Sequence, residues 1–230
     1  VPNFTTSGYG LTPELAAICK KYCGAVAVSW YRSVYTLNAI KMLLDAGVKT
    51  NIHYVLGKNS IDEAIRRLRE NDFPAGINAV IFLLHKPAGQ GTKANMLDFH
   101  DPRVAAFFAE VDRRHPFKVG MDSCNVPGAI HFCKSILPES LDTCEGARYS
   151  CYIGADLLMV PCSFDQEKRY QVQLDETTDI EAAWNSEPFE RFRDKMRAAC
   201  PGCEKKALCM GGCPLMPEIV FCGSEKRMTT

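Results

Sequence analysis

The sequence predicts an α/β fold, in which a partial, TIM-like (β/α) barrel segment is followed by a small cysteine-rich α+β domain. Strand-like segments at 25–30, 51–56 and 79–85 recur with a period of about 27 residues and alternate with amphipathic helices. Strands spaced in this way are parallel and joined by right-handed crossovers. The 230 residues include 12 cysteines, most of which follow residue 120, where the repeat ends. We therefore place the barrel segment, too short to close a barrel alone, at 1–120 and the cysteine-rich domain at 121–230.

Turn and capping residues mark the helices of the repeat. Thr12 followed by Pro13 is typical of a helix start, because proline fits the first helical position. A second helix starts near Ser33 and ends at Gly47, since glycine readily takes the left-handed conformation that closes helices. Both patterns predict helices between the strands.

Two further helices each carry an apolar stripe at helical spacing. Ser60 with Glu63 predicts a capping box at the start of the first. Asp101 as the cap and Pro102 at the first helical position open the second. The two stripes consist of Ile61, Ala64, Ile65 and Leu68, and of Val104, Phe107, Phe108 and Val111.

The region after residue 120 is more irregular. A short strand pair is expected at 155–160 and 170–174, followed by a helix at 187–199. The apolar face of this helix consists of Phe189, Phe192 and Met196. Its basic residues are expected on the solvent-exposed face, and these are Arg191, Arg193, Lys195 and Arg197. Apolar burial alone is too small to stabilise this region, so we expect metal clusters to cross-link it.

Composition excludes some classes of function. Lys and Arg number 27 and so do Asp and Glu, so no net field attracts nucleic acid or an anionic membrane. No apolar run approaches the roughly 20 residues of a membrane span. The chain begins at Val1, which indicates the interior of a domain, and cysteines spread through helices and strands favour a reducing cytoplasm.

The cysteine spacing near the C-terminus is the most specific feature of the chain. Cys200-Pro-Gly-Cys203 and Cys209-Met-Gly-Gly-Cys213 form a C-x2-C-x5-C-x3-C pattern. The other cysteines within reach are Cys133, Cys144, Cys151, Cys162 and Cys222. A [4Fe–4S] cluster takes four thiolates, so eight cysteines would hold two clusters. One alternative is structural zinc, which is usually held by two closely spaced pairs of ligands that lie far apart in the sequence. The other is disulfides in a secreted scaffold.

These motifs resemble the C-terminal two-thirds of a radical S-adenosylmethionine (radical SAM) enzyme with a SPASM domain. The signature of that domain is the C-x2-C-x5-C-x3-C core, Pro161-Cys162 after a short strand, and the trailing Cys222. The segment from Trp184 to Arg193 is also similar to the one that precedes the core in this family. By the same resemblance, the third to sixth barrel strands correspond to 4–8, 26–30, 51–56 and 80–85.

The resemblance implies two auxiliary [4Fe–4S] clusters. Auxiliary cluster I would be held by Cys144, Cys151, Cys162 and Cys213. Auxiliary cluster II would be held by Cys200, Cys203, Cys209 and Cys222. Because Cys213 crosses to cluster I, it would tie the two halves of the domain together.

One family motif is missing from these residues. Radical SAM enzymes carry a C-x3-C-x2-C motif whose three thiolates hold the cluster that cleaves S-adenosylmethionine, but here Val26 follows Cys19 and Cys23 at the third position. We expect these two cysteines to be buried on a helix instead. S-adenosylmethionine and a third [4Fe–4S] cluster would therefore need a region N-terminal to Val1, and the chain alone is predicted to be inactive.

Candidate site residues lie where a parallel barrel places its chemistry, at the carboxyl ends of the strands. Ser29, His53 and His85 would contact S-adenosylmethionine by the resemblance, and a structural hydrogen bond is the alternative for each.

Cys124 and Asp165 are the candidate catalytic residues. Cys124 follows a short strand near the expected barrel lumen, and an inert buried thiol is its alternative. Sulfatase-maturing members of the family have an aspartate base directly after Pro-Cys, where this chain has Ser163, with Asp165 two residues on. This difference argues against formation of formylglycine.

The resemblance implies an oxidoreductase that modifies a peptide or protein substrate by radical hydrogen abstraction. A flavodoxin or ferredoxin would supply the electron that cleaves S-adenosylmethionine to methionine and a 5′-deoxyadenosyl radical. Two other classes stay open: a non-catalytic iron–sulfur electron-transfer or binding module, and a zinc-stabilised structural protein. An upstream C-x3-C-x2-C motif would distinguish the first from the enzyme, and a metal and sulfide assay would identify the second.

Overall fold

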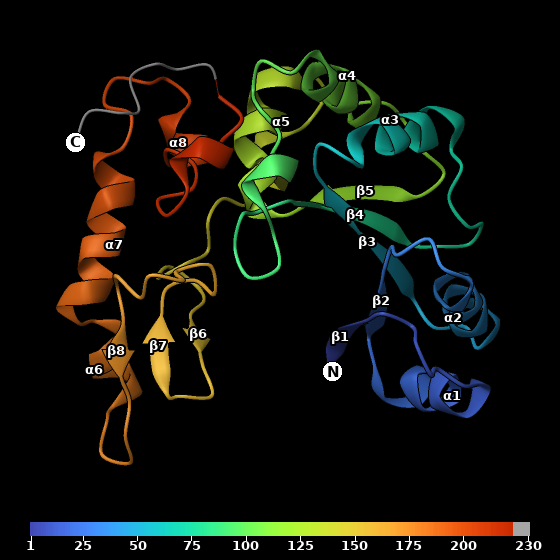
Figure 1. The fold of residues 1–230 in the computed structure, drawn as a ribbon, viewed down its shortest axis with the longest axis horizontal. Coiled ribbons are helices and arrows are strands. Elements are labelled where there is room, and N and C mark those ends of the chain that lie inside the picture. The colour runs from blue at the N-terminus through green and yellow to red at the C-terminus, as the bar shows by residue number, and fades with distance from the viewer. Residues whose placement is uncertain (223–230) are drawn as a thin grey trace. The chain divides into compact units, whose positions relative to one another are not determined.

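The computed structural model describes residues 1–222, and the chain divides into two compact units (Figure 1). The first unit consists of Val1–His85 and Pro102–Asp122. The second consists of Lys86–Asp101 and the chain from Ser123 onward. The division of the chain into domains at residue 120 stays a prediction.

A five-stranded parallel sheet forms the centre of the first unit, in the order β1-β2-β3-β4-β5 (Figure 1). A helix lies between each pair of consecutive strands, as the repeat in the sequence predicted. The strands are β1 (Asn3–Thr6), β2 (Ala25–Ser29), β3 (Thr50–Leu56), β4 (Ala79–Leu84) and β5 (Lys118–Met121). The helices are α1 (Pro13–Tyr22), α2 (Val34–Asp45), α3 (Ile61–Glu70) and α4 (Pro102–Val111). The predicted α/β fold is confirmed.

The two faces of this sheet are buried to different degrees. On β3, Tyr54 is buried on one face, whereas Asn51 and His53 are half-buried on the other. The buried face packs against the apolar stripes of the helices, where the rings of Phe82 and Phe107 lie 4.9 Å apart. The face with Asn51 and His53 is therefore the one left for polar chemistry.

Two predicted helix boundaries are confirmed. The Thr12 hydroxyl accepts a hydrogen bond from the Leu15 amide at 3.3 Å, with Pro13 at the first helical position of α1. Gly47, with φ of 71°, follows the last residues of α2. Local sequence was sufficient here, because both signals act within one helical turn.

The predicted capping box of α3 is wrong, because both of its side chains are engaged elsewhere. The Ser60 hydroxyl accepts a hydrogen bond from the Gly57 amide at 2.9 Å and donates to the Val55 carbonyl at 2.8 Å. It closes the loop before the helix and makes no cap hydrogen bond to the helix. Glu63 turns away from Ser60 and enters an ion-pair network.

Glu63 connects α3 to β3 and to the segment that follows β2 through partly buried charges. Its carboxylate accepts hydrogen bonds from Trp30 Nε1 at 3.3 Å and from Arg67 Nε at 2.7 Å, and it pairs with Arg32. The Tyr54 hydroxyl lies 3.1 Å from the same carboxylate. Partial burial alone would raise the pKa of Glu63, but the hydrogen bonds outweigh burial and lower the pKa to about 2.

The second unit combines short helices with a three-stranded antiparallel sheet, in the order β6-β7-β8 (Figure 1). The predicted strand pair is confirmed as β7 and β8, whereas β6 was not predicted. The strands are β6 (Tyr152–Ile153), β7 (Leu158–Val160) and β8 (Val172–Gln173). The α-helices are α5 (Val126–Phe132), α6 (Ile180–Trp184), α7 (Glu187–Ala198) and α8 (Lys206–Cys209). The 3-10 helices are η1 (Lys93–Asn95), η2 (Ser123–Asn125), η3 (Pro138–Ser140) and η4 (Pro217–Ile219).

Across residues 1–222, none of the helices is long and apolar enough to pass through a membrane.

Helix α7 supplies the core of the second unit. Phe189, Phe192 and Met196 are buried in one cluster with Met159 and Tyr170, and the rings of Phe192 and Tyr170 lie 5.2 Å apart. The apolar face predicted for this helix is confirmed. The core is larger than the irregular sequence after residue 120 indicated, because it is assembled from segments far apart in the chain.

Arg193 contradicts the prediction that every basic residue of α7 faces solvent. Its side chain is 14% exposed and donates hydrogen bonds to the carbonyls of Ala147 and Trp184, each at 2.7 Å. The residue stands four positions after Phe189, so it lies at the edge of the buried face. The hydrogen bond from Arg193 thereby attaches the loop that contains Ala147 to α7.

Glu63→Gln is expected to remove an acid-sensitive contribution to the stability of the first unit. Because the folded pKa of about 2 lies below the ordinary 4.5, this contribution is present above about pH 4.5 and is lost as the pH falls towards 2. Glu63 is 22% exposed, so solvent screening limits the contribution to about 1–2 kcal/mol. Urea unfolding at pH 7 and at lower pH should show a less stable variant whose stability falls less on acidification.

The matched control is Glu70→Gln, in a pair with Arg66 in which both side chains are about half exposed. This change should leave the stability of the unit nearly unchanged, because exposed ion pairs contribute little. The same loss of stability on acidification in wild type and Glu63→Gln would contradict the assignment.

Candidate metal centre

Backbone in the left-handed region shapes the cysteine loop 200–213. The residues with positive φ are Cys200 (51°), Gly202 (76°), Met210 (49°), Gly211 (83°) and Gly212 (79°). Glycine takes this conformation easily, whereas Cys200 and Met210 do so at about 1 kcal/mol each. The Cys203 amide donates to the Cys200 carbonyl at 3.2 Å, and the Gly212 amide donates to the Cys209 carbonyl at 3.0 Å. Each turn brings the two cysteines of its pair closer together in space than an extended backbone would.

Cys209 lies in a group of four thiols, which we call the second thiol group. Burial raises the pKa of Cys209, and the neighbouring thiols of Cys200, Cys203 and Cys222 raise it further. The structure thus brings together the four residues that the resemblance assigns to auxiliary cluster II.

The first thiol group consists of Cys124, Cys144, Cys162 and Cys213. Burial raises the pKa of Cys144 to about 11, and the thiols of Cys124 and Cys162 add to the rise. Burial and then Cys124 also raise the pKa of Cys162. At Cys213 the largest influence is a hydrogen bond from the Cys124 thiol, which lowers the pKa. Three members are the ligands that the resemblance assigns to auxiliary cluster I, and Cys124 is an addition that the sequence did not predict.

Cys151 differs from these residues because it is exposed. It follows a turn in which the amides of Arg148, Tyr149 and Ser150 all donate to the Glu145 carbonyl. Its part as a ligand of auxiliary cluster I stays a prediction.

Backbone amides donate hydrogen bonds to the sulfurs of both groups. In each case the amide two residues further along the chain is a donor: Gly146 to Cys144, Phe164 to Cys162, Gly211 to Cys209 and Leu215 to Cys213. The Met216 amide also lies 3.4 Å from the sulfur of Cys213. These bonds stabilise the thiolate form, and hydrogen bonds to sulfur tune the reduction potentials of iron–sulfur clusters. Buried thiols with amide donors are therefore a donor set that fits such a cluster.

Two cations lie near the first thiol group. Arg148 lowers the pKa of Cys144, and its guanidinium donates to the Cys144 carbonyl at 3.2 Å. Lys86 lowers the pKa of Cys162, and its ammonium lies 4.6 Å from the centre of the Phe164 ring. Neither residue could be predicted from the sequence, since no spacing links Arg148 or Lys86 to a cysteine motif.

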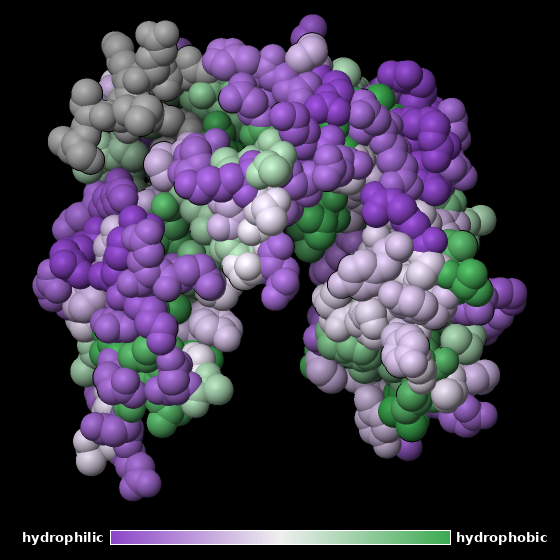
Figure 2. All heavy atoms as spheres, in the orientation of Figure 1, coloured by the Kyte–Doolittle hydropathy of each residue, from purple (hydrophilic) through white to green (hydrophobic). Residues whose placement is uncertain are grey.

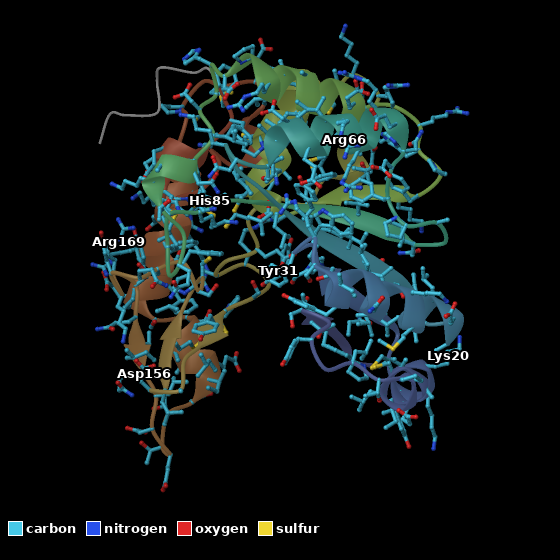
Figure 3. The ribbon with its side chains drawn as sticks, turned by 45° about the vertical axis from the view of Figure 1, so that its right-hand side comes forward. Lys20, Tyr31, Arg66, His85, Asp156 and Arg169 are labelled. Atoms are coloured by element: carbon cyan, nitrogen blue, oxygen red, sulfur yellow. The ribbon has the colours of Figure 1, made fainter. Side chains whose placement is uncertain are left out.

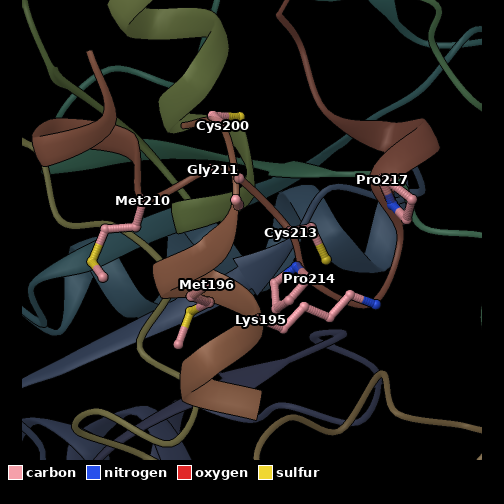
Figure 4. A pocket seen from close by; sticks show the side chains of 10 residues that line it. Lys195, Met196, Cys200, Met210, Gly211, Cys213, Pro214 and Pro217 are labelled. Carbon is pink, nitrogen blue, oxygen red and sulfur yellow. The ribbon is translucent and has the colours of Figure 1, made fainter. Parts of the chain in front are cut away.

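A cavity of about 250 Å³ is lined by one residue of each thiol group, Cys200 and Cys213 (Figure 4). Its lining also includes Lys195 and Met196 of α7 and the backbone of Gly211. The two thiol groups therefore border a common space beside α7.

The arrangement of these thiols suits a cluster better than a single ion. Within the described residues, no three His, Cys, Asp or Glu side chains are placed as ligands of one metal ion. The thiolates of a cluster bind different irons, so they lie further apart than the ligands of one zinc ion. None of the cysteines in residues 1–222 forms a disulfide, and each of the two groups contains four thiols.

Ser29 and His53 lie side by side in the first unit, where β2 pairs with β3. The Nδ1 atom of His53 is 3.3 Å from the Thr5 hydroxyl of β1, and burial lowers the pKa of His53. His85 follows β4, and its amide donates to the Leu56 carbonyl at 2.8 Å (Figure 3). The lowered pKa keeps His53 a neutral hydrogen-bonding group at neutral pH.

Asp165 lies buried in a turn of the second unit. Its Oδ2 accepts the Tyr170 amide at 3.0 Å, and its own amide donates to the Cys162 carbonyl at 2.9 Å. Arg169, which Figure 3 labels, has its Nε 3.7 Å from Oδ1. These contacts hold the turn that follows Cys162, which supports a structural role for Asp165.

Residues 144–205 match the family model of SPASM, an iron–sulfur cluster-binding domain. No curated protein sequence matches the chain. Solved structures of anSMEcpe, an anaerobic sulfatase-maturating radical SAM enzyme, are similar in fold. The structure described as native anSMEcpe with bound AdoMet and Kp18Cys peptide has a TM-score of 0.65 and 14% identity, over 98% of this chain and 68% of that chain. The one with AdoMet and Cp18Cys peptide has a TM-score of 0.66 at the same identity and coverage.

Residues 144–205 therefore match a SPASM domain, and the fold of the chain is similar to that of a radical SAM enzyme with such a domain. The resemblance seen in the cysteine motifs is confirmed at this level. At 14% identity the structural likeness establishes the fold alone.

Gly211→Ala is expected to disrupt the cysteine loop. A Cβ at this position would overlap the Cβ of Ala199 at the end of α7, and the backbone has φ of 83°. We expect a loss of about 2–4 kcal/mol from the clash and the left-handed conformation together. Gly202→Ala is the matched control, because its φ is 76° but nothing lies within 4 Å of the added atom.

Limited proteolysis and thermal melting of the two variants test this assignment. Gly211→Ala should be cleaved faster within 200–213 and melt lower, while Gly202→Ala should lose only about 1 kcal/mol. Equal behaviour of the two variants would show that the close approach to Ala199 is unimportant.

Proposed function

We propose that this protein is a radical SAM oxidoreductase whose second unit holds two auxiliary [4Fe–4S] clusters. The observation that carries the proposal is the gathering of cysteine thiols into two groups of four, within and just beyond the segment that matches SPASM. Amide donors to the sulfurs and the radical SAM type of fold support it.

The second thiol group would hold auxiliary cluster II, and Cys144, Cys162 and Cys213 would hold auxiliary cluster I, with Cys151 as the fourth ligand by the resemblance. When bound, such clusters accept and release single electrons. The amides beside the sulfurs lower the free energy of placing thiolates in a buried site. Arg148 and Lys86 offset part of the negative charge of the thiolates.

The half-buried polar face of the first unit would bind S-adenosylmethionine. Ser29 and His53 lie next to each other there, and His85 follows the neighbouring strand β4. Hydroxyl and neutral imidazole groups can hydrogen-bond the ribose and adenine without adding charge. Their placement towards the carboxyl ends of parallel strands supports this role.

The substrate we propose is a peptide or protein, and the reaction is radical hydrogen abstraction. Two of the similar structures hold a peptide together with AdoMet, which supports a substrate of this class. A flavodoxin or ferredoxin would deliver electrons, in the reducing cytoplasm where clusters and free thiols persist.

A further βα segment would complete the barrel against β1. Strand β1 is at the edge of the sheet, and residues 3–5 are exposed. Apolar side chains also gather on the surface over α1, where Leu15, Ile18 and Tyr22 are about half exposed along one face (Figure 2). Edges of parallel sheets are normally covered, so this apolar edge suits the segment that would carry the C-x3-C-x2-C motif.

The metal content tests the first part of the proposal. Anaerobically purified protein should be brown, with about eight irons and eight sulfides per chain. Cys209→Ala should lose about four irons and become protease-sensitive near 200–222, while the core around α7 stays folded. One or two zinc ions without sulfide, or unchanged iron in Cys209→Ala, would contradict the proposal.

Assays of S-adenosylmethionine cleavage test the second part. The 230 residues contain no C-x3-C-x2-C motif, and four thiolates on each auxiliary cluster leave no open iron. The iron-loaded chain alone should therefore yield no 5′-deoxyadenosine under reducing, anaerobic conditions, and adding a polypeptide with the motif should restore it. Formation of 5′-deoxyadenosine by the chain alone would instead indicate an auxiliary cluster with only three thiolates. A loaded chain that gives no product with such a polypeptide would support the non-catalytic module.

A further inference from the structure

The Cys124 thiol interacts with every other member of the first thiol group. It donates a hydrogen bond to Cys213, and its charge acts on both Cys144 and Cys162. Cys151, which the resemblance gives as the fourth ligand, is exposed, whereas Cys124 is half-buried. The four sulfurs that gather in the structure thus differ by one residue from the predicted set.

The segment that carries Cys124 is fixed against the cysteine loop. Cys124 lies in η2, directly before α5, and α5 contacts α8. The Lys205 ammonium donates to the Ile130 carbonyl of α5 at 3.1 Å. The Phe99 ring packs on the rings of His131 and Phe132, at the same C-terminal end of α5, with centroids 5.0 and 5.4 Å away. The helix that directly follows Cys124 is therefore held by contacts with two other segments of the second unit.

Cys151 lies in a different setting. In the tight turn before it, residues 145–150, three backbone amides donate hydrogen bonds to the same carbonyl. Arg193 of α7 donates a hydrogen bond to the Ala147 carbonyl in that turn. Tyr152, the next residue, is 49% exposed. Cys151 is therefore exposed beside an anchored turn, whereas the Cys124 thiol donates a hydrogen bond to Cys213.

We infer that Cys124, in place of Cys151, is the fourth thiolate of auxiliary cluster I. The inference rests on the proposed function, since it concerns one ligand of a cluster proposed there. With Cys124 bound, each iron of that cluster has a protein ligand, and no coordination position remains for a substrate. Auxiliary cluster I would then pass electrons, and the peptide would be held by other groups. Cys151 would remain a free surface thiol.

Thiol labelling of the unaltered, iron-loaded protein tests the inference without a mutation. After brief anaerobic exposure to N-ethylmaleimide and peptide mass spectrometry, Cys151 should be modified at least about tenfold faster than Cys124. Removal of iron with a chelator should make Cys124 reactive and leave the rate at Cys151 unchanged. Protection of Cys151 that ends when iron is removed would overturn the inference.

The matched variants Cys124→Ala and Cys151→Ala give a second readout, because alanine cannot ligate iron. Cys124→Ala should lose between one and about four irons. Its oxidised form should show the electron paramagnetic resonance signal of a [3Fe–4S] cluster, or its reduced form should lack the signal of cluster I. Cys151→Ala should keep about eight irons and the wild-type spectrum. Full iron content and an unchanged spectrum in Cys124→Ala, or loss of iron in Cys151→Ala, would overturn the inference.

The outcome of these experiments separates this inference from the proposed function. Wild-type protein without iron or sulfide would refute the proposed function before any variant is compared. Wild-type protein with about eight irons in which Cys151 is protected would leave the two clusters in place and refute only the assignment of Cys124. If Cys124→Ala does not fold, the labelling of the unaltered chain decides the question.

Discussion

Placing several thiolates close together in a buried site is the constraint on which the second unit depends. Burial disfavours the charged form, as the pKa of about 11 at Cys144 shows, and each neighbouring thiolate adds repulsion. Backbone amides two residues along the chain, together with Arg148 and Lys86, oppose both effects. In the cysteine loop such an amide belongs to a glycine with positive φ, Gly211, so the shape of that backbone and the electrostatics of the site are linked.

Helix α7 connects the parts that supply the thiols. Its apolar face forms the core with Met159 and Tyr170, and Arg193 holds the turn after Cys144 through Ala147. Just beyond its end, Ala199 packs so closely against the cysteine loop that only glycine fits at position 211. Both segments that carry cysteines are therefore attached to one helix, and disturbance of α7 would reach both thiol groups.

The first unit separates stability from chemistry by the two faces of its sheet. The face towards the helices is apolar and contains the linked rings of Tyr54, Phe82 and Phe107. The opposite face keeps His53 and its neighbours half-buried, where hydrogen bonds are still available to a ligand. The Glu63 network lies beside these strands, so the charge that stabilises this unit does not occupy the polar face.

Local and periodic signals in the sequence determined the secondary structure and the fold class. Apolar residues at helical spacing, Pro13 after Thr12 and Gly47 after a helix act within a few residues, so they could be interpreted without a structure. The C-x2-C-x5-C-x3-C spacing indicated iron–sulfur chemistry for the same reason, because the backbone between those cysteines is short. Only the tertiary structure decided what Glu63, Arg193 and Cys124 contact. Their partners are distant in sequence, and several side chains compete for each position, so the packing of whole elements sets which contacts form.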